Sequence, residues 1–301
     1  MRICIVEPIG ILGSEVQAML PDHEVVEFDS RGMSDADLIE RCRGCRVMAL
    51  TSRPLSASVI DSLPDLGLIA VAFAGVDSVD TAAAESRNVL VRNAQGYANT
   101  AVAELALGFM ITLARHVVTL NRSIRDGGVA QVGNELRGKT ITVIGTGGIG
   151  REVMRLSEAF GMKTVPFDRD SRITLLDAIS GADFVSLHVP LTPTTRGLFG
   201  TDQFTAMKTT AYLVNLARGP IVDAEALDTA LGSGSIAGAA LDVFDRDPPL
   251  PRDYPLLRHD NVIATPHIGF DTVEAVRKKG ELTAEHIAEY VRAQHLANGS
   301  A

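Results

Sequence analysis

The sequence has little of what membrane, secreted or nucleic-acid-binding proteins need. It contains no tryptophan and only three cysteines in 301 residues, and no apolar run approaches the roughly 18 residues that cross a bilayer. Its N-terminus has no apolar stretch or cleavage site of a signal peptide. Acidic residues outnumber basic ones by 37 to 28, and the resulting charge of -9 repels phosphate backbones. We therefore expect a cytoplasmic protein that binds neither membranes nor nucleic acid.

The few cysteines do not predict a metal site. Cys42 and Cys45 form a CxxC pair, but a zinc site needs about four ligands, and no second pair or nearby histidine supplies the others. We expect this pair to lie unligated at the end of a helix. Cys4 alternates with Ile3 and Ile5 in an apolar strand, so it is expected in the core.

Short apolar runs alternate with helical patterns along the chain. In the first part, strands are expected at residues 3–6, 25–28, 47–50, 68–72 and 89–92. A long helical pattern covers 98–125, and six further strands are expected at 141–144, 164–167, 184–187, 211–215, 237–241 and 262–264. A last helical pattern covers 272–294. This alternation predicts an α/β fold of two doubly wound parallel-sheet domains.

A glycine-rich turn joins the strand at 141–144 to a helical pattern. In the sequence GTGGIG, Gly145 makes the tight turn, Gly147 lets the backbone approach a pyrophosphate, and Gly150 lets the helix pack on the strand. The helix N-terminus then presents free N–H groups to the anion. We therefore expect Gly145, Gly147, Gly148, Ile149 and Gly150 to bind a dinucleotide.

Asp168 ends the next strand, where an acidic residue meets the adenosine ribose hydroxyls. A carboxylate there repels a 2′-phosphate, so it favours NAD over NADP, although the neighbouring Arg169 weakens that preference. The alternative interpretation of Asp168 is a plain strand terminus.

Polar residues also follow other strands of the second unit. In an open α/β sheet the ligand lies beyond the carboxyl ends of the strands, so Arg218, an acidic residue and His267 are expected to face one crevice. A guanidinium binds a keto oxygen and a carboxylate, and a histidine donates the proton that a reduced carbonyl oxygen needs. A carboxylate beside that histidine raises its pKa. Together these residues predict carbonyl reduction.

At this point the sequence resembles a known family, the D-isomer-specific 2-hydroxyacid dehydrogenases. The resemblance covers nearly the whole chain and rests on the glycine turn together with the motifs GVD at 75–77, VAELA at 102–106, HVPLT at 188–192, NLARGPIVD at 215–223, ALDVF at 240–244 and TPHIG at 265–269. It implies a Rossmann NAD-binding domain, residues 96–269, inserted into a flavodoxin-like substrate domain, residues 1–95 and 270–301, with the active site in the cleft.

The same resemblance implies roles for individual residues. Arg218 would bind the substrate, His267 would be the general acid/base, and the N–H groups around Ala74, Gly75 and Val76 would hold the substrate carboxylate. Further cofactor contacts are expected from His188, Val189, Pro190, Thr195, Leu216, Ala217, Asp242 and Gly269.

The sequence departs from the family pattern in two places. Where the family usually has a Glu before the proline of the DVF loop, this chain has Asp247, which is shorter by one methylene; Asp245 is the alternative partner for His267. The connection from Asp168 to Leu175 is also short and lacks an extra strand, so the adenine side of the NAD site is expected to be more open.

The substrate itself is less well defined. Arg53 follows a strand of the first unit and either approaches a second anionic group of the substrate or is a solvated loop arginine. Phosphoglycerate-type members of the family that this sequence resembles tend to have more basic residues in this loop, whereas this chain has one arginine, so the resemblance implies a small unphosphorylated 2-keto acid. The helix from Ala98 is apolar on more than one face, which predicts burial inside one subunit or, as the resemblance implies, a homodimer.

Two other functions remain as alternatives. The first is a dinucleotide-sensing binding protein like the co-repressors of this fold, and the second is hydride removal from formate or phosphite.

Overall fold

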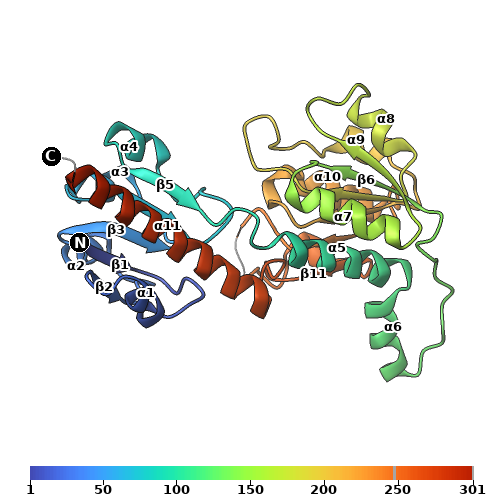
Figure 1. Ribbon diagram of the computed structural model, residues 1–301. Coiled ribbons are helices and arrows are strands. Elements are labelled where there is room, and N and C mark those ends of the chain that lie inside the picture. Colours follow the sequence, from blue (N-terminus) through green and yellow to red (C-terminus); the bar gives the residue numbers. More distant parts are fainter. Residues whose placement is uncertain (247–248, 300–301) are drawn as a thin grey trace. The chain divides into compact units, whose positions relative to one another are not determined.

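The computed structural model describes residues 1–246 and 249–299 and divides into two compact units (Figure 1). Unit 1 comprises Met1–Ala98 with Thr272–Ala301, and unit 2 comprises Asn99–Asp271. The boundaries expected from the sequence are 95/96 and 269/270. Each unit contains one sheet in which every pairing of neighbouring strands is parallel.

Unit 1 has the strand order β2-β1-β3-β4-β5, which is the flavodoxin-like order. Its strands are β1 (Arg2–Ile5), β2 (Glu24–Glu27), β3 (Cys45–Leu50), β4 (Leu68–Val71) and β5 (Leu90–Asn93). Its helices are α1 (Gly13–Met19), α2 (Asp35–Arg41), α3 (Ala57–Asp61), α4 (Thr81–Ser86) and α11 (Val273–Gly299). The expectation of a doubly wound parallel sheet is confirmed.

Alternate side chains of the central strands fill two separate cores. Ile3 and Ile5 pack on one face of the sheet with residues of α11, whereas Cys4 packs on the other face with residues of α2 and α3. Figure 1 shows α11 along one side of this sheet. Because both faces are covered, the central strands are apolar throughout, as parallel strands usually are.

The cysteines lie where the sequence places them. Cys4 is fully buried in β1, and Cys42 is the C-cap residue of α2. Cys45 begins β3, and its N–H donates to the carbonyl of Cys42 at 2.9 Å, which closes a tight turn. All three thiols are free and buried.

Unit 2 has the strand order β11-β10-β9-β8-β6-β7. Its strands are β6 (Thr140–Ile144), β7 (Lys163–Phe167), β8 (Phe184–Leu187), β9 (Tyr212–Asn215), β10 (Gly238–Leu241) and β11 (Val262–Ala264). Its main helices are α5 (Asn99–Ala114), α6 (Val117–Ser123), α7 (Gly148–Ala159), α8 (Leu175–Ser180), α9 (Thr201–Ala206) and α10 (Ala224–Gly232), with short 3-10 segments η1 (Ile124–Asp126), η2 (Gly219–Ile221) and η3 (Pro255–Arg258). Only α8 lies between β7 and β8, so the short connection contains no additional strand.

The long helix expected over 98–125 is broken. It ends at Ala114, and α6 begins at Val117 after His116, which adopts a left-handed conformation with φ of 54°. A residue with positive φ cannot continue a right-handed helix, and periodicity gives no sign of it. Among the described helices, none alone is long and apolar enough to cross a membrane, whereas α5 and Val117–Asp126 pass that test as a pair bent by 53°.

Candidate functional site

The expected site residues of unit 2 lie along one edge of its sheet. Because all the strands run parallel, their carboxyl ends meet at that edge, where open α/β sheets bind ligands. The residues that directly follow these strands are Gly145, Asp168, His188, Leu216, Asp242 and Thr265. The strand order reverses between β6 and β8, so the glycine turn after β6 lies at the topological switch point.

The glycines of the turn differ in what surrounds them. Gly145 has φ of 99°, and a Cβ there would lie 2.5 Å from the carbonyl oxygen of His188. A Cβ on Gly150 would lie 1.9 Å from the carbonyl oxygen of Gly145, so helix α7 packs on this turn only with glycine. Gly147, the N-cap of α7, has nothing within 4 Å of a Cβ position. The space above the helix N-terminus is therefore open to an anion.

Asp168 is held in place by donors from the turn and from its own loop. Its carboxylate accepts hydrogen bonds from the Thr146 hydroxyl at 2.5 Å, the Asp170 N–H at 3.0 Å and the Ser171 hydroxyl at 3.3 Å. These bonds, that of Thr146 first, lower the pKa of Asp168, so the carboxylate stays ionised. Arg169 is exposed and forms its ion pair with Asp170 at 3.8 Å.

The residues present fit a dinucleotide with an unphosphorylated ribose. Gly147 leaves room at the N-terminus of α7 for a pyrophosphate, and Asp168 supplies an ionised acceptor at the end of the neighbouring strand β7. An ionised carboxylate accepts from ribose hydroxyls and repels a phosphate in their place.

His188 begins the loop that follows β8. Its Nε2 is hydrogen-bonded to the Ser186 hydroxyl at 2.8 Å, whereas its Nδ1 is buried without a partner among the described residues. Burial lowers the pKa of His188 to about 4, so the ring is neutral. The loop then folds back, and the Thr195 hydroxyl donates to the carbonyl of Pro190 at 2.6 Å.

Arg218 follows β9 in a loop held by Asn215. The buried Asn215 side chain accepts from the Ala217 N–H at 3.0 Å and donates to the Arg218 carbonyl at 3.1 Å. The Arg218 Nη1 donates to the Ala217 carbonyl at 2.8 Å. Sequence reasoning assigned no role to Asn215, although an asparagine at the end of an apolar strand is a signal for such a loop bond.

The loop that carries His267 is held by the buried residue Asp242. Its carboxylate accepts from the Thr265 hydroxyl at 2.5 Å and from the N–H groups of Ile268 and Gly269 at 2.8 and 2.7 Å. The His267 N–H donates to the Asp242 carbonyl at 2.9 Å, and His267 has φ of 59°. Such a backbone strain persists only where the surroundings enforce it, and it is common at functional sites. Asp242, expected as a cofactor contact, thus also fixes the loop that carries His267.

The loops of Arg218 and His267 lie against each other. A Cβ on Gly269 would lie 3.0 Å from the Asp242 carboxylate and 3.4 Å from the Leu216 side chain. Leu216 is two residues before Arg218, and Gly269 is two residues after His267. The structure therefore brings these two loops together at one edge of the sheet.

The acidic partner expected for His267, Asp247, lies outside the described residues. The alternative, Asp245, accepts a hydrogen bond from the Tyr254 hydroxyl at 2.7 Å and forms an ion pair with Arg246 at 3.4 Å. The Tyr254 hydroxyl is the main cause that lowers the pKa of Asp245. Asp245 is therefore bonded within its own loop.

In unit 1, the expected carboxylate-binding segment follows β4. Among the described residues, the N–H groups of Ala74, Gly75 and Val76 donate no hydrogen bond, and the Asn93 side chain holds the segment by donating to the Ala74 carbonyl at 2.5 Å. Three neighbouring N–H groups without an acceptor are suited to bind an anion.

Arg53 is not a solvated loop arginine, because the Nη atoms of its guanidinium are bonded within unit 1. Its side chain is only 11% exposed and forms an ion pair with Asp35 at 2.9 Å. Its Nη1 donates to the carbonyls of Ser30 at 2.7 Å and Met33 at 3.0 Å. These acceptors follow β2, which the sequence could not place beside the loop after β3.

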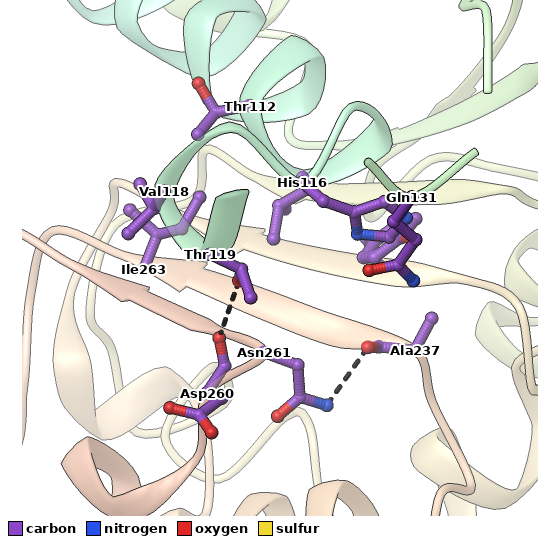
Figure 2. Close-up of a pocket in the computed structure, with 11 residues that line it drawn as sticks. Thr112, His116, Val118, Thr119, Gln131, Ala237, Asp260, Asn261 and Ile263 are labelled. Carbon is purple, nitrogen blue, oxygen red and sulfur yellow. Dashed lines mark hydrogen bonds between the residues drawn. The ribbon is translucent and has the colours of Figure 1, made fainter. Parts of the chain in front are cut away.

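A separate cavity of about 260 Å³, lined by both polar and apolar residues, opens at the opposite edge of the unit 2 sheet (Figure 2). The residues labelled there include His116, Thr119 and Gln131, together with Asn261, whose side chain donates to the Ala237 carbonyl at 3.0 Å. Ala237 and Asn261 precede β10 and β11, so this cavity lies at the amino ends of the strands. The residues that line this cavity are different from the site residues at the carboxyl ends of the strands.

Comparison with known proteins agrees with this geometry. Residues 107–269 match the family model described as D-isomer specific 2-hydroxyacid dehydrogenase, NAD binding domain. The chain is 38% identical over 292 residues to D-3-phosphoglycerate dehydrogenase from Methanocaldococcus jannaschii, an alignment that covers 91% of this chain and 55% of that protein. The chain thus spans about half the length of that relative.

Two further matches cover nearly the whole of both chains. Glycerate dehydrogenase from Methylorubrum extorquens is 34% identical over 284 residues, which are 89% of this chain and 90% of that protein. The NAD-complexed D-isomer specific 2-hydroxyacid dehydrogenase from Lactobacillus delbrueckii matches with a TM-score of 0.82 and 27% identity, covering 97% of this chain and 98% of that one. The chain therefore belongs to the D-isomer specific 2-hydroxyacid dehydrogenases and carries the NAD-binding domain of that family.

Proposed function

We propose that this chain is an NAD-dependent D-2-hydroxyacid dehydrogenase that also reduces small 2-keto acids. The observation that carries the proposal is the position of Gly269, whose N–H donates to the Asp242 carboxylate and which leaves no room for a side chain beside Leu216, so that the His267 loop lies beside the Arg218 loop at the edge where the glycine turn lies. A proton donor, a guanidinium and a dinucleotide turn on one edge are the groups that carbonyl reduction needs. The relatives described above give no support to a dinucleotide-sensing co-repressor.

The dinucleotide is proposed to lie on the glycine turn and on the loops after β7 to β11. Its contacts would come from Gly145, Gly147, Gly148, Ile149, Gly150, Asp168, His188, Val189, Pro190, Thr195, Leu216, Ala217, Asp242 and Gly269. When bound, NAD accepts the hydride from the hydroxyacid, and NADH supplies it in the reverse direction.

The chain's own residues bind the acid and move the proton. Arg218 orients the substrate through its planar guanidinium, and the N–H groups of Ala74–Val76 bind the substrate carboxylate. His267 donates a proton to the keto oxygen as the carbonyl is reduced, and removes it during oxidation. Asp247 stabilises the protonated ring, because a neighbouring carboxylate favours the imidazolium.

The test replaces the two groups that would touch the substrate. His267→Ala and Arg218→Ala are each expected to lower kcat/KM for the best 2-keto acid by about 100-fold to 10,000-fold, the usual loss for a proton-transfer group. Binding of NADH, measured by fluorescence titration, should remain within a few-fold of the wild type. Near-normal turnover by either variant would contradict the proposal.

We also propose a homodimer in the cytoplasm. Most of α5 is buried within unit 2, but the segment after it exposes four apolar side chains: Val117, Ile124, Val129 and Val132. Val129 and Val132 are 86% and 93% exposed, which supports their burial against a second copy. Light scattering on the double variant Val129→Asp/Val132→Asp should give a monomer; an unchanged dimer would remove this segment from the interface.

The proposed cytoplasmic location is supported by the cysteines, because three unpaired buried thiols agree with a reducing compartment.

A further inference from the structure

Two loops at the carboxyl edge of the unit 1 sheet each present three consecutive backbone N–H groups. One loop follows β3 and contains Thr51, Ser52 and Arg53, and the other follows β4 and contains Ala74–Val76. Because β3 and β4 are neighbours in the sheet, the two loops start from adjacent strands. Consecutive N–H groups in a turn are a common way to bind an anion.

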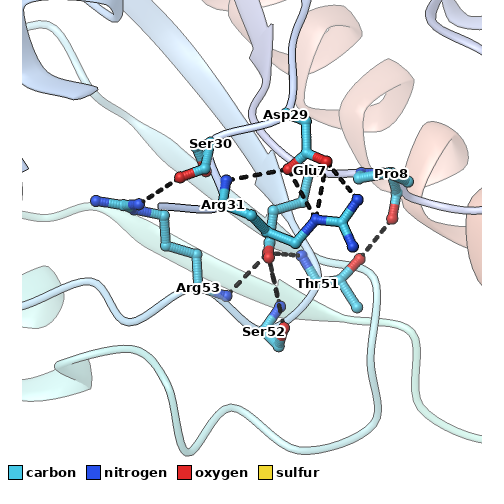
Figure 3. Close-up of polar contacts among 8 residues, drawn as sticks. All are labelled: Glu7, Pro8, Asp29, Ser30, Arg31, Thr51, Ser52 and Arg53. Carbon is cyan, nitrogen blue, oxygen red and sulfur yellow. Dashed lines mark hydrogen bonds and ion pairs between the residues drawn. The ribbon is translucent and has the colours of Figure 1, made fainter. Parts of the chain in front are cut away.

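The first of these loops already holds an anion from the protein itself. The Glu7 Oε2 accepts from the N–H groups of Thr51 at 2.8 Å, Ser52 at 2.7 Å and Arg53 at 2.8 Å (Figure 3). Glu7 is only 5% exposed, and the Ser52 hydroxyl also donates to its Oε1 at 3.4 Å. The Thr51 hydroxyl donates to the Pro8 carbonyl at 2.8 Å, which holds the loop against the segment that carries Glu7.

The arginines around this carboxylate are bonded to other groups. Arg53 pairs with Asp35 and two backbone carbonyls, as described above. Arg31 forms a two-atom contact with Asp29, its Nε at 2.8 Å and its Nη2 at 2.5 Å from Oδ2. In the described part of the chain Glu7 itself forms no ion pair, and its carboxylate is held by the three N–H groups and the Ser52 hydroxyl, while Arg31 interacts with it only through space.

The second loop has the opposite character. The N–H groups of Ala74–Val76 have no internal acceptor among the described residues, whereas Leu55 ties the two loops together by donating to the Ser78 carbonyl at 2.7 Å and accepting from the Asp80 N–H at 2.9 Å. One triplet of donors is thus open to a ligand anion, and the other is filled by Glu7.

We infer that Glu7 is a specificity-determining residue that restricts the enzyme to 2-keto acids whose only anionic group is the carboxylate. This inference rests on the proposed function. A substrate that carries a second anion, such as a phosphate, finds the donors of the β3 loop occupied and a carboxylate in their place. Like charges brought together at such a site disfavour binding, which is how many sites reject a wrong ligand.

The first experiment compares a matched pair of substrates on the purified full chain with NADH. Hydroxypyruvate and its phosphate ester differ only in the phosphoryl group, and glyoxylate serves as a third substrate. We expect kcat/KM for the parent acid to exceed that for the ester by about 100-fold, the scale of one unfavourable charge contact. Equal or preferred reduction of the ester overturns the inference. If no keto acid is reduced at all, the proposed function fails and the inference falls with it.

The second experiment removes the charge and keeps the shape. Glu7→Gln is expected to reduce the selectivity ratio by about tenfold through a lower KM for the ester, because the repulsion is lost. The control is Asp29→Asn, which makes the same charge change at the exposed carboxylate paired with Arg31 and should leave the ratio within about twofold. General damage to the fold would lower kcat/KM for both substrates together and would leave the selectivity ratio unchanged.

An unchanged ratio in Glu7→Gln, or an equal shift in Asp29→Asn, overturns the role of Glu7. If Glu7→Gln does not fold, inhibition of the wild type by the products gives the answer. D-glycerate should inhibit reduction of glyoxylate at a concentration about 100-fold lower than its 3-phosphate ester, and equal inhibition overturns the inference.

Discussion

In the glycine turn of unit 2, two substitutions only three residues apart are expected to have different effects, one on the binding of NADH and the other on the stability of the fold. Gly147 has φ of -68° and ψ of -165°, an extended backbone that any residue adopts, and its Cβ position is free of neighbours within 4 Å. Gly147→Val should therefore fold normally. Its side chain would project into the space above the N-terminus of α7, where the pyrophosphate is proposed to lie.

The expected magnitude follows from the hydrogen bonds that the pyrophosphate would lose. A hydrogen bond to a charged group contributes about 1.5 to 3 kcal/mol, so displacing the anion from one or two N–H groups costs about 3 kcal/mol. That value corresponds to a rise of about 150-fold in the Kd for NADH. The midpoint of thermal unfolding should stay within about 2 °C of the wild type, since no contact within the fold is lost.

Gly150→Val is the matched control. A Cβ at this position would lie 1.9 Å from the Gly145 carbonyl oxygen and 3.3 Å from the Val143 side chain, so α7 would have to move away from β6. Overpacking of this kind costs about 1 to 3 kcal/mol. At about 2 to 4 °C for each kcal/mol in a domain of this size, the midpoint should fall by about 2 to 12 °C.

The assays are fluorescence titration with NADH and thermal unfolding followed by circular dichroism. If Gly147→Val binds NADH as tightly as the wild type, the turn does not hold the pyrophosphate. If Gly147→Val is destabilised as much as Gly150→Val, the space above the helix is not open, and the assignment of separate roles to these glycines is refuted.

Asp242→Asn should lower kcat/KM by about 100-fold, because a displacement of His267 by about 1 Å has that effect, and should change the Kd for NADH much less; equal losses in both would contradict a positioning role. The pKa of His188 lies at about 4 in the fold against 6.5 ordinarily, so its contribution to stability is present above pH 6.5 and is lost as the pH falls through about 4. Urea unfolding should show a loss of about 3 kcal/mol over that interval in the wild type and not in His188→Gln. Cys42 and Cys45, whose pKa values are raised by the Cys4 thiol and by burial, should not react with a thiol reagent at pH 8 before unfolding; prompt reaction of the native protein would contradict their burial.

The strands were predictable because burial on both faces makes each of them a short apolar run. All eleven expected strands overlap an observed one, and the bounds of β8 and β11 coincide with the prediction. The short helices α4, α8, α9 and α10 were not predicted. In α4 the signal is present, because the Asp80 side chain caps the helix by accepting from the Ala83 N–H at 2.9 Å, but six residues are too few to show a helical period.

The site was predictable to the extent that it depends on strand ends. A parallel sheet gathers the residues that follow its strands at one edge, so the sequence identified the loops of Arg218 and His267 without any coordinates. What each side chain bonds to depends on loop conformation, and the left-handed φ of His267 has no sequence signal because its side chain is not glycine. Asn215, which holds the Arg218 loop, was missed although an asparagine at the end of an apolar strand is a signal for a loop bond.

Buried carboxylates at the edge of a parallel sheet have roles that depend on the loops beside them, which the sequence does not reveal. Glu7 follows β1 and accepts three backbone N–H bonds from the loop after β3. Asp242 follows β10 and accepts two from the loop after β11. A loop that turns back at such an edge leaves its N–H groups without partners in the sheet, and burying them unpaired is costly. A carboxylate from the adjacent strand satisfies several of them at once. Counting the backbone donors around a buried acidic residue therefore shows which loop that residue holds: Asp242 fixes the loop of His267, and Glu7 occupies the donors of the loop after β3.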